Sequence, residues 1–173
     1  LDQVSEWVST FNRTLGTVDI LVNNAGVTIV LRTGEAIRTV FVESDLAFWK
    51  EQISLNFYGC LHCTHAVLGS MIERKEGKII SIISDAGRIG EANMAVYSGA
   101  KAGVLAFSKA LAKEVGENKI NVNCIAMGAT AHEGIRNFLN PDATPENDEL
   151  LRRMLRAYPI GKGLGRIGRP FDA

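Results

Sequence analysis

The sequence has few of the features that mark a membrane, secreted or nucleic-acid-binding protein. It contains three cysteines, which cannot all pair, and no secretory signal or uninterrupted apolar run of membrane length. Neither sign of charge is in excess, because 19 Lys and Arg residues balance 19 Asp and Glu residues. This balance removes the electrostatic basis for general binding to nucleic acid or to an anionic membrane. We therefore expect a cytoplasmic protein with neither kind of partner.

The apolar content is high enough for a folded core. Of the 173 residues, 46% are apolar and 22% are charged, which suits one ordinary domain. The chain begins at Leu1, inside an amphipathic helical pattern that includes Trp7, and it stops at Ala173 without a helix cap or a final strand. We expect residues 1–173 to be one partial domain of a longer protein, with strands missing before it and an end missing after it.

Short apolar runs alternate with longer helical patterns. The apolar runs predict buried strands at residues 18–22, 78–83 and 120–125. The helical patterns lie at residues 44–73, 97–115 and 145–157. Ser44 is the expected N-cap of the first of these helices. Strands that are apolar on both faces and separated by helices predict an α/β fold, a Rossmann-like doubly wound parallel sheet with helices on both sides.

Polar segments follow each of the three predicted strands. They are residues 23–26, 84–90 and 127–130. In an open parallel sheet, ligands bind beyond the carboxyl ends of the strands. We therefore expect these three segments to face one crevice.

Four polar residues in or near these segments suggest chemistry. Tyr97 and Lys101 are four residues apart and share one face of a helix. A phenol has a pKa of about 10, and a neighbouring ammonium lowers that value, so Tyr97 is a candidate acid and base. Ser84 would hold the substrate oxygen near it. Asn56 lies on the apolar stripe of its helix and should be buried, with a water molecule that links its amide to Lys101 as one possible partner.

Each of these features has an ordinary explanation when it is taken alone. Tyr-x-x-x-Lys pairs are common, Asn56 could be a helix amide satisfied by backbone, and Ser84 could cap a loop. Residues 23–26 could be a simple turn. Their appearance together, in order and at strand ends, favours a catalytic site.

Motifs along almost the whole chain also resemble one family. They are DILVNNAG at 19–26, LN at 55–56, GKII at 77–80, SDAG at 84–87, YSGAKAG at 97–103, INVN at 120–123 and GRIGRP at 165–170. In these motifs the chain resembles the short-chain dehydrogenase/reductase family, in its 3-oxoacyl-(acyl-carrier-protein) reductase-like group.

This resemblance implies an oxidoreductase that transfers hydride between NAD or NADP and a secondary alcohol or ketone. A 3-hydroxyacyl or 3-oxoacyl thioester is one candidate substrate, and the full-length protein would be a homodimer or homotetramer. The resemblance implies a catalytic tetrad, which consists of Asn56, Ser84, Tyr97 and Lys101. It also implies residues that contact the cofactor, namely Asn23, Ala25, Gly26, Tyr97, Lys101 and Gly128. Gly26 would let the backbone approach the cofactor closely.

The sequence departs from the family pattern in two places. The glycine-rich turn that holds the pyrophosphate is not present before Asn23, so the choice between NAD and NADP is not readable. Met127 stands where the family has proline, and His132 stands where it has threonine. Without the preceding strand, residues 18–22 would form an exposed edge, so we expect residues 1–173 alone to be inactive and poorly soluble.

These departures leave a second function open. The chain could be a non-catalytic dehydrogenase-like protein that binds a nucleotide or a partner subunit. A sugar-nucleotide epimerase of the extended branch shares Tyr-x-x-x-Lys, but the Asn-Asn-Ala-Gly motif at 23–26 disfavours it.

Two further clusters do not require a separate function. The first could suggest zinc, and it consists of Cys60, His62, Cys63 and His65. On one helix these side chains point to different faces, so we expect no metal. The second is a stripe of small residues, Gly99, Gly103, Ala106 and Ala110. Good packing on the sheet would explain this stripe, but we favour a close approach between subunits.

Overall fold

The structure is a computed structural model that describes residues 2–26, 40–130, 144, 146, 148–157 and 166–168. The chain forms two compact units, residues 1–28 with 38–126 and residues 29–37 with 127–173. That the chain is one partial domain therefore stays a prediction.

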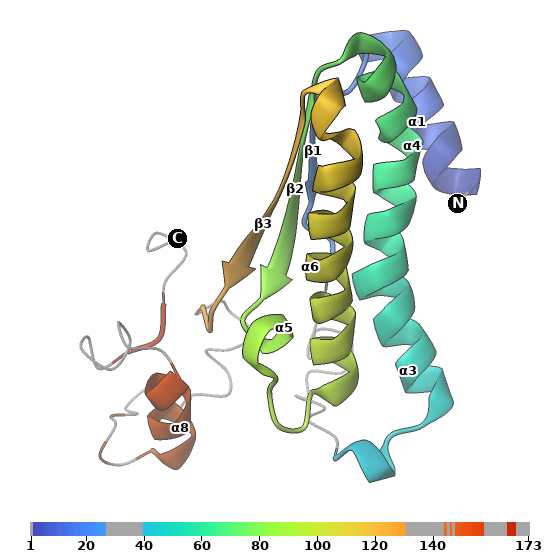
Figure 1. Cartoon of the computed structure of the whole chain (residues 1–173). Helices are drawn as coiled ribbons and strands as arrows, with labels where there is room; N and C mark the ends of the chain where they lie inside the picture. The colour runs from blue at the N-terminus through green and yellow to red at the C-terminus, as the bar shows by residue number, and fades with distance from the viewer. Residues whose placement is uncertain are drawn as a thin grey trace. The chain divides into compact units, whose positions relative to one another are not determined.

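A three-stranded sheet forms the centre of the first unit. Its strands are β1 (Ile20–Asn23), β2 (Gly77–Ser84) and β3 (Ile120–Met127), in the order β1-β2-β3. β1 runs parallel to β2, with Ile20 opposite Lys78 and Asn23 opposite Ser81. The three arrows of Figure 1 point the same way. The predicted strands and the Rossmann-like α/β class are confirmed.

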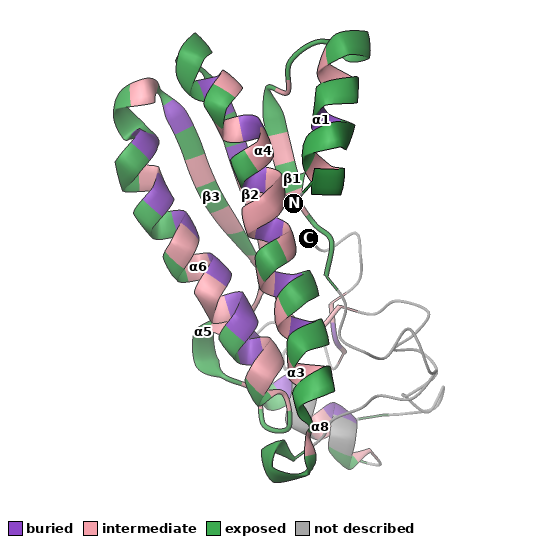
Figure 2. Cartoon of the chain, turned by 90° about the vertical axis from the view of Figure 1, so that its right-hand side faces the viewer, coloured by how far each residue is buried: buried purple, intermediate pink, exposed green. Residues whose placement is uncertain are grey.

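Helices α1 (Asp2–Leu15), α4 (Gly59–Arg74) and α6 (Ala95–Val115) cover one face of this sheet (Figure 1). α3 (Leu46–Ile53) leads into α4 through a single π-helical turn, η2 (Ser54–Tyr58). Figure 2 shows the buried positions of α4 and α6 as stripes along the helices. The main core joins these helices to the strands, and it contains Val8, Val67, Met71, Ile79, Leu111, Val115 and Ile120.

The opposite face of the sheet is open in the described part of the first unit. Ile20 and Val22 on β1 are 54% and 52% exposed, and Ile125 on β3 is 48% exposed. The sequence predicted that both faces of these strands would be buried. In the described residues, helices cover only one face of the sheet. Trp7 was expected on the apolar face of its helix, but it is 64% exposed. Val8 is the buried residue of α1.

The predicted N-cap at Ser44 is wrong by one residue. Asp45 caps α3, because its side chain accepts a hydrogen bond from the Phe48 backbone N–H at 2.8 Å. The Ser44 hydroxyl has other partners, since it donates to the Phe41 carbonyl and accepts from the Trp49 indole at 2.7 Å. Both residue types favour caps, so the tertiary contact with Trp49 decides between them.

Shorter elements complete the described residues. They are η1 (Phe41–Glu43), α5 (Ala86–Ile89) and η3 (Gly116–Asn118) in the first unit, and α8 (Glu149–Ala157) in the second. α8 lies within the helix predicted at 145–157 and buries Leu151 and Leu155. Among the described residues, no helix has the length and apolar character needed to cross a membrane.

Candidate active site

The structure brings Ser84 and Tyr97 together at the carboxyl end of β2. Ser84 is the last residue of that strand, and Tyr97 lies in the first turn of α6. Ser84 lies close enough to Tyr97 to lower the pKa of its phenol. The Ser84 hydroxyl also accepts the backbone N–H of Ala86 at 3.2 Å, which fixes it at the start of α5. The Nζ of Lys101 lies 5.9 Å from the centre of the Tyr97 ring, so these three residues share one site.

The expected effect of Lys101 on the tyrosine is not seen. Burial raises the pKa of the Tyr97 phenol above its ordinary value, and the proximity of Ser84 lowers it by less. Lys101 is 7% exposed, and its ammonium donates to the Ile82 carbonyl at 3.0 Å. Burial lowers the pKa of Lys101. The lowered pKa expected from the i, i+4 pair is therefore not present in this structure, because burial of both groups outweighs their proximity on the helix.

Two glycines approach Lys101 from opposite ends of its side chain. A Cβ added to Gly26, after β1, would lie 2.9 Å from the Lys101 Nζ and 3.0 Å from the Asn56 Oδ1. A Cβ added to Gly87, in α5, would lie 2.7 Å from the Lys101 Cβ and 2.8 Å from its carbonyl carbon. At Gly87 the crowded atoms belong to the backbone and to the base of a side chain, so only a residue without a side chain fits there. At Gly26 they are the far ends of two side chains, which would have to move. The close approach at Gly26 in this structure is to Lys101 and Asn56, and its approach to a cofactor stays a prediction.

Asn56 is buried in the π-helical turn. It is 2% exposed, as the sequence predicted. Its Nδ2 donates to the backbone carbonyl of Gln52 at 3.1 Å and to the Gln52 Oε1 at 3.3 Å. The sequence analysis missed Gln52, which is also 2% exposed. Its position one turn before Asn56 on the buried stripe was the available signal.

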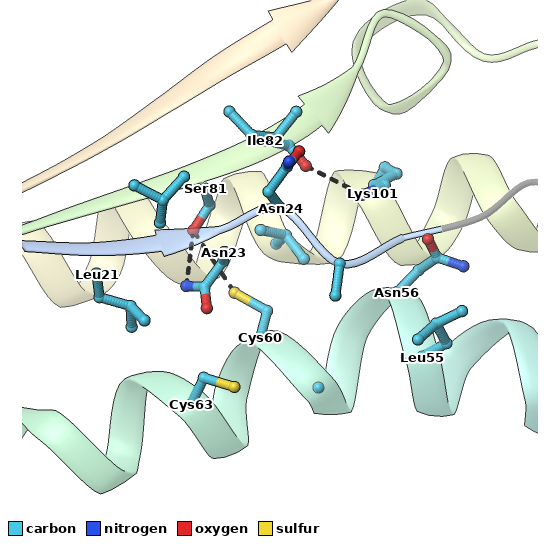
Figure 3. A pocket seen from close by; sticks show the side chains of 14 residues that line it. Leu21, Asn23, Asn24, Leu55, Asn56, Cys60, Cys63, Ser81, Ile82 and Lys101 are labelled. Atoms are coloured by element: carbon cyan, nitrogen blue, oxygen red, sulfur yellow. Dashed lines mark hydrogen bonds between the residues drawn. The ribbon is translucent and has the colours of Figure 1, made fainter. Parts of the chain in front are cut away.

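Asn23 connects β1 to its neighbours. Its Nδ2 donates to the Thr64 hydroxyl at 3.1 Å. It also donates to the Ser81 hydroxyl at 3.3 Å, as Figure 3 shows. Its side-chain nitrogen is therefore committed to protein contacts. The predicted contacts of Asn23, Ala25 and Gly26 with a cofactor stay predictions, as does that of Gly128, which belongs to the second unit. His132 lies outside the described residues.

A small cavity opens between β1 and α4 (Figure 3). Its volume is about 130 Å³, and its lining includes Asn24, Ala25, Asn56, Cys63 and Lys101. The side chains of Lys101 and Asn56, together with the backbone exposed by Gly26, give this edge the donors and acceptors that a polar ligand needs. The bare backbone at Gly26 leaves the Lys101 ammonium uncrowded, and an ammonium is a donor that suits the hydroxyl groups of a nucleotide ribose.

The cysteines do not provide an alternative nucleophile. Burial raises the pKa of the Cys60 and Cys63 thiols, which keeps them protonated and poorly reactive. The Cys60 sulfur lies 3.5 Å from the Ser81 hydroxyl. In the part of the chain that the structure describes, no three His, Cys, Asp or Glu side chains are grouped to hold a metal ion.

The small residues of α6 divide into two groups. Gly103 packs against η2, because an added Cβ would lie 3.1 Å from the Phe57 ring. Gly99, Ala106 and Ala110 are exposed. Packing therefore explains Gly103, and the approach of a second subunit to the exposed residues stays a prediction.

The chain is similar in sequence to known dehydrogenases and reductases. The family model for short chain dehydrogenase matches residues 1–142. The 3-oxoacyl-(acyl-carrier-protein) reductase FabG of Chlamydia trachomatis is 37% identical over 172 residues, which are 99% of this chain and 61% of that protein. The acetoacetyl-CoA reductase of Shinella zoogloeoides is 35% identical over 167 residues, which are 96% of this chain and 61% of that protein.

A solved structure gives the same result for the fold. The crystal structure of a short-chain dehydrogenase from Streptomyces avermitilis matches with a TM-score of 0.69 and 30% identity, over 76% of this chain and 46% of that one. The parallel sheet is Rossmann-like, and Ser84 of β2 lies with Tyr97 and Lys101 of α6 at its carboxyl end, where such sheets bind their ligands. The chain belongs to the short-chain dehydrogenase family. It spans 61% of the length of the two reductases named above.

Proposed function

We propose that the full-length protein is a nicotinamide-dependent oxidoreductase that reduces a ketone to a secondary alcohol. We further propose a 3-oxoacyl thioester as its substrate class. The similarity to a 3-oxoacyl-(acyl-carrier-protein) reductase and to an acetoacetyl-CoA reductase supports both proposals. The chain gives no basis for choosing between NAD and NADP.

The observation that carries the proposal is the grouping of Ser84, Tyr97 and Lys101 at the carboxyl end of β2. In the reduction, Tyr97 donates its phenolic proton to the carbonyl oxygen while Ser84 holds that oxygen by a hydrogen bond. Burial raises the pKa of Tyr97, so the phenol carries its proton at neutral pH. Lys101 and the backbone at Gly26 would hold the ribose of the cofactor, which supplies the hydride when it is bound.

The direct test is a cofactor-oxidation assay on the full-length protein. Acetoacetyl-CoA is the probe, with NADPH and NADH in separate reactions, and the loss of reduced-nicotinamide absorbance is followed. We expect turnover with at least one cofactor. Tyr97→Phe should lower kcat by roughly 100-fold or more, because it removes the transferable proton and little volume. Cofactor binding without turnover on any ketone would refute the proposal and support a non-catalytic, nucleotide-binding role.

We also propose that the full-length protein is a homodimer or homotetramer. The exposed small residues of α6, Gly99, Ala106 and Ala110, support this proposal, since they allow two helices to approach closely. Sedimentation velocity of the wild type and of Ala106→Arg tests it. We expect the substitution to dissociate the assembly, and a monomeric wild type would refute the proposal.

A further inference from the structure

Two amide side chains, Gln52 at the end of α3 and Asn56 in η2, are buried next to each other beside the candidate site. Each is 2% exposed, and they are one helical turn apart. We propose that Gln52 is a positioning residue, which fixes the orientation of the Asn56 amide so that its oxygen faces Lys101. This inference rests on the proposed function for its effect on turnover.

The contacts on the nitrogen side set the orientation. The Asn56 Nδ2 donates to the Gln52 backbone carbonyl at 3.1 Å and to the Gln52 Oε1 at 3.3 Å. A backbone carbonyl can only accept a hydrogen bond, so the group that faces it must be a donor. The side-chain oxygen of Gln52 adds a second acceptor to the same nitrogen. Together they hold the amide with its nitrogen toward α3.

The π-helical turn explains why the Asn56 side chain can reach back to Gln52. In an α-helix the carbonyl of residue 52 accepts from the backbone N–H of residue 56. In this turn the Ser54 carbonyl accepts from the Gly59 N–H, five residues along. A π-helical turn pairs each carbonyl with a backbone N–H five residues later instead of four. Here the side chain of Asn56 donates a hydrogen bond to the backbone carbonyl of Gln52.

The opposite side of the amide faces the site. The Asn56 Oδ1 and the Lys101 Nζ both approach the same face of Gly26, at 3.0 Å and 2.9 Å from the position of an added Cβ. With its oxygen on this side, the amide presents an acceptor to an ammonium. A rotated amide would present two N–H donors to the ammonium and its oxygen to the Gln52 carbonyl, and both pairings are unfavourable.

Gln52 could be buried only because it fills space in the core. Two substitutions distinguish this role from the orientation of the Asn56 amide. Gln52→Met keeps the length of the side chain and removes the acceptor, whereas Gln52→Glu keeps an oxygen at that position. We expect Gln52→Met to lower kcat by about five- to tenfold, because one of two acceptors is lost. The KM for the ketone should stay near the wild-type value, and the pH profile of kcat should move. Gln52→Glu should recover part of the loss. A Gln52→Met enzyme with the wild-type kcat and pH profile would overturn the inference.

A double-mutant cycle with Asn56→Ala tests whether Gln52 acts through Asn56. The effect of Gln52→Met on kcat should disappear in the Asn56→Ala background, since the amide to be oriented is gone. The matched control is Ser108→Ala, which truncates another buried polar side chain, 3% exposed, on α6. Its effect should be the same in both backgrounds. Equal effects of Gln52→Met in both backgrounds would overturn the inference.

A readout without turnover keeps this inference distinct from the proposed function. If the wild type reduces no ketone, the proposed function fails, and the orientation of Asn56 is then measured by NMR. The side-chain amide protons of Asn56 should exchange with solvent faster in the folded Gln52→Met protein than in the wild type. Unchanged exchange rates would show that Gln52 does not hold the amide.

Discussion

Replacing Gly87 with alanine should damage the site without touching any of its polar atoms. The new Cβ would lie 2.7 Å from the Lys101 Cβ, 2.8 Å from its carbonyl carbon and 2.9 Å from the Ala102 nitrogen. These atoms belong to the backbone and the base of a side chain, so they cannot swing aside. The segment that carries Gly87 and Ser84 must move away from α6 instead.

The size of this movement follows from the contacts. Ordinary contact begins at 3.4 Å and the closest approach is 2.7 Å, so the shift is about 0.7 Å. Overpacking of this kind costs about 1–3 kcal/mol of folding free energy. Ser84 lies three residues before Gly87 and would move with it, away from Tyr97 on α6. Because a misplacement of about 1 Å can cost about 100-fold in rate, we expect kcat to fall by roughly 10- to 100-fold.

The assay compares Gly87→Ala with Gly69→Ala in the full-length protein. Gly69 is an exposed glycine of α4 with no atom within 4 Å of its added Cβ, so this control should keep the wild-type kcat and gain up to about 1 kcal/mol of stability. Urea denaturation measures stability and the ketone assay measures kcat. A Gly87→Ala protein with wild-type stability and kcat would show that the packing of α5 on α6 does not hold Ser84 in place.

Three further predictions concern the pH profile, the core and the cofactor loop. Ser84→Ala should lower kcat for reduction by roughly 10- to 100-fold through the lost hydrogen bond to the substrate oxygen. Ser84 lowers the pKa of Tyr97, so its loss should move the alkaline decline of the rate to higher pH; a shift to lower pH would contradict this in a pH–rate series. Met71→Ala should lower the free energy of unfolding by about 2–5 kcal/mol, and Ile72→Ala by much less, because Met71 is 0% and Ile72 is 37% exposed. Equal losses in urea denaturation would show that Met71 is not central to the core. Gly26→Ala should raise the Kd of the cofactor in a fluorescence titration, since its methyl group displaces the nearby ammonium, and an unchanged Kd would place the cofactor elsewhere.

Periodicity and strand-end motifs were enough to predict the elements and the grouping of Ser84 with Tyr97. The residues of β2 and β3 form apolar runs, and α6 carries a strong helical pattern, so local sequence and tertiary structure agree there. The cap of α3 was not predictable to the residue, because Ser44 and Asp45 are both good caps and a contact with Trp49 decides between them.

The electrostatics of the site depended on tertiary contacts that spacing does not contain. The i, i+4 pair placed Tyr97 and Lys101 on one face but did not show that the ammonium would donate to the carbonyl of Ile82. Nor did it show the burial that sets the direction of both pKa shifts. Gln52 was missed for a similar reason, because its partner depends on a π-helical turn at Asn56 that no residue type announces.

The two glycines of the strand-end motifs have a common explanation in Lys101. This lysine is 7% exposed, although its chain of four methylenes ends in a charge. Backbone can enclose such a side chain only where it has no side chains of its own, and this occurs at Gly87 beside the base and at Gly26 beside the ammonium. The same enclosure removes water from the ammonium, lowers its pKa and leaves the Ile82 carbonyl as its acceptor. The glycine of each motif is therefore tied to the ionisation of one lysine, a link that neither motif shows when it is read separately.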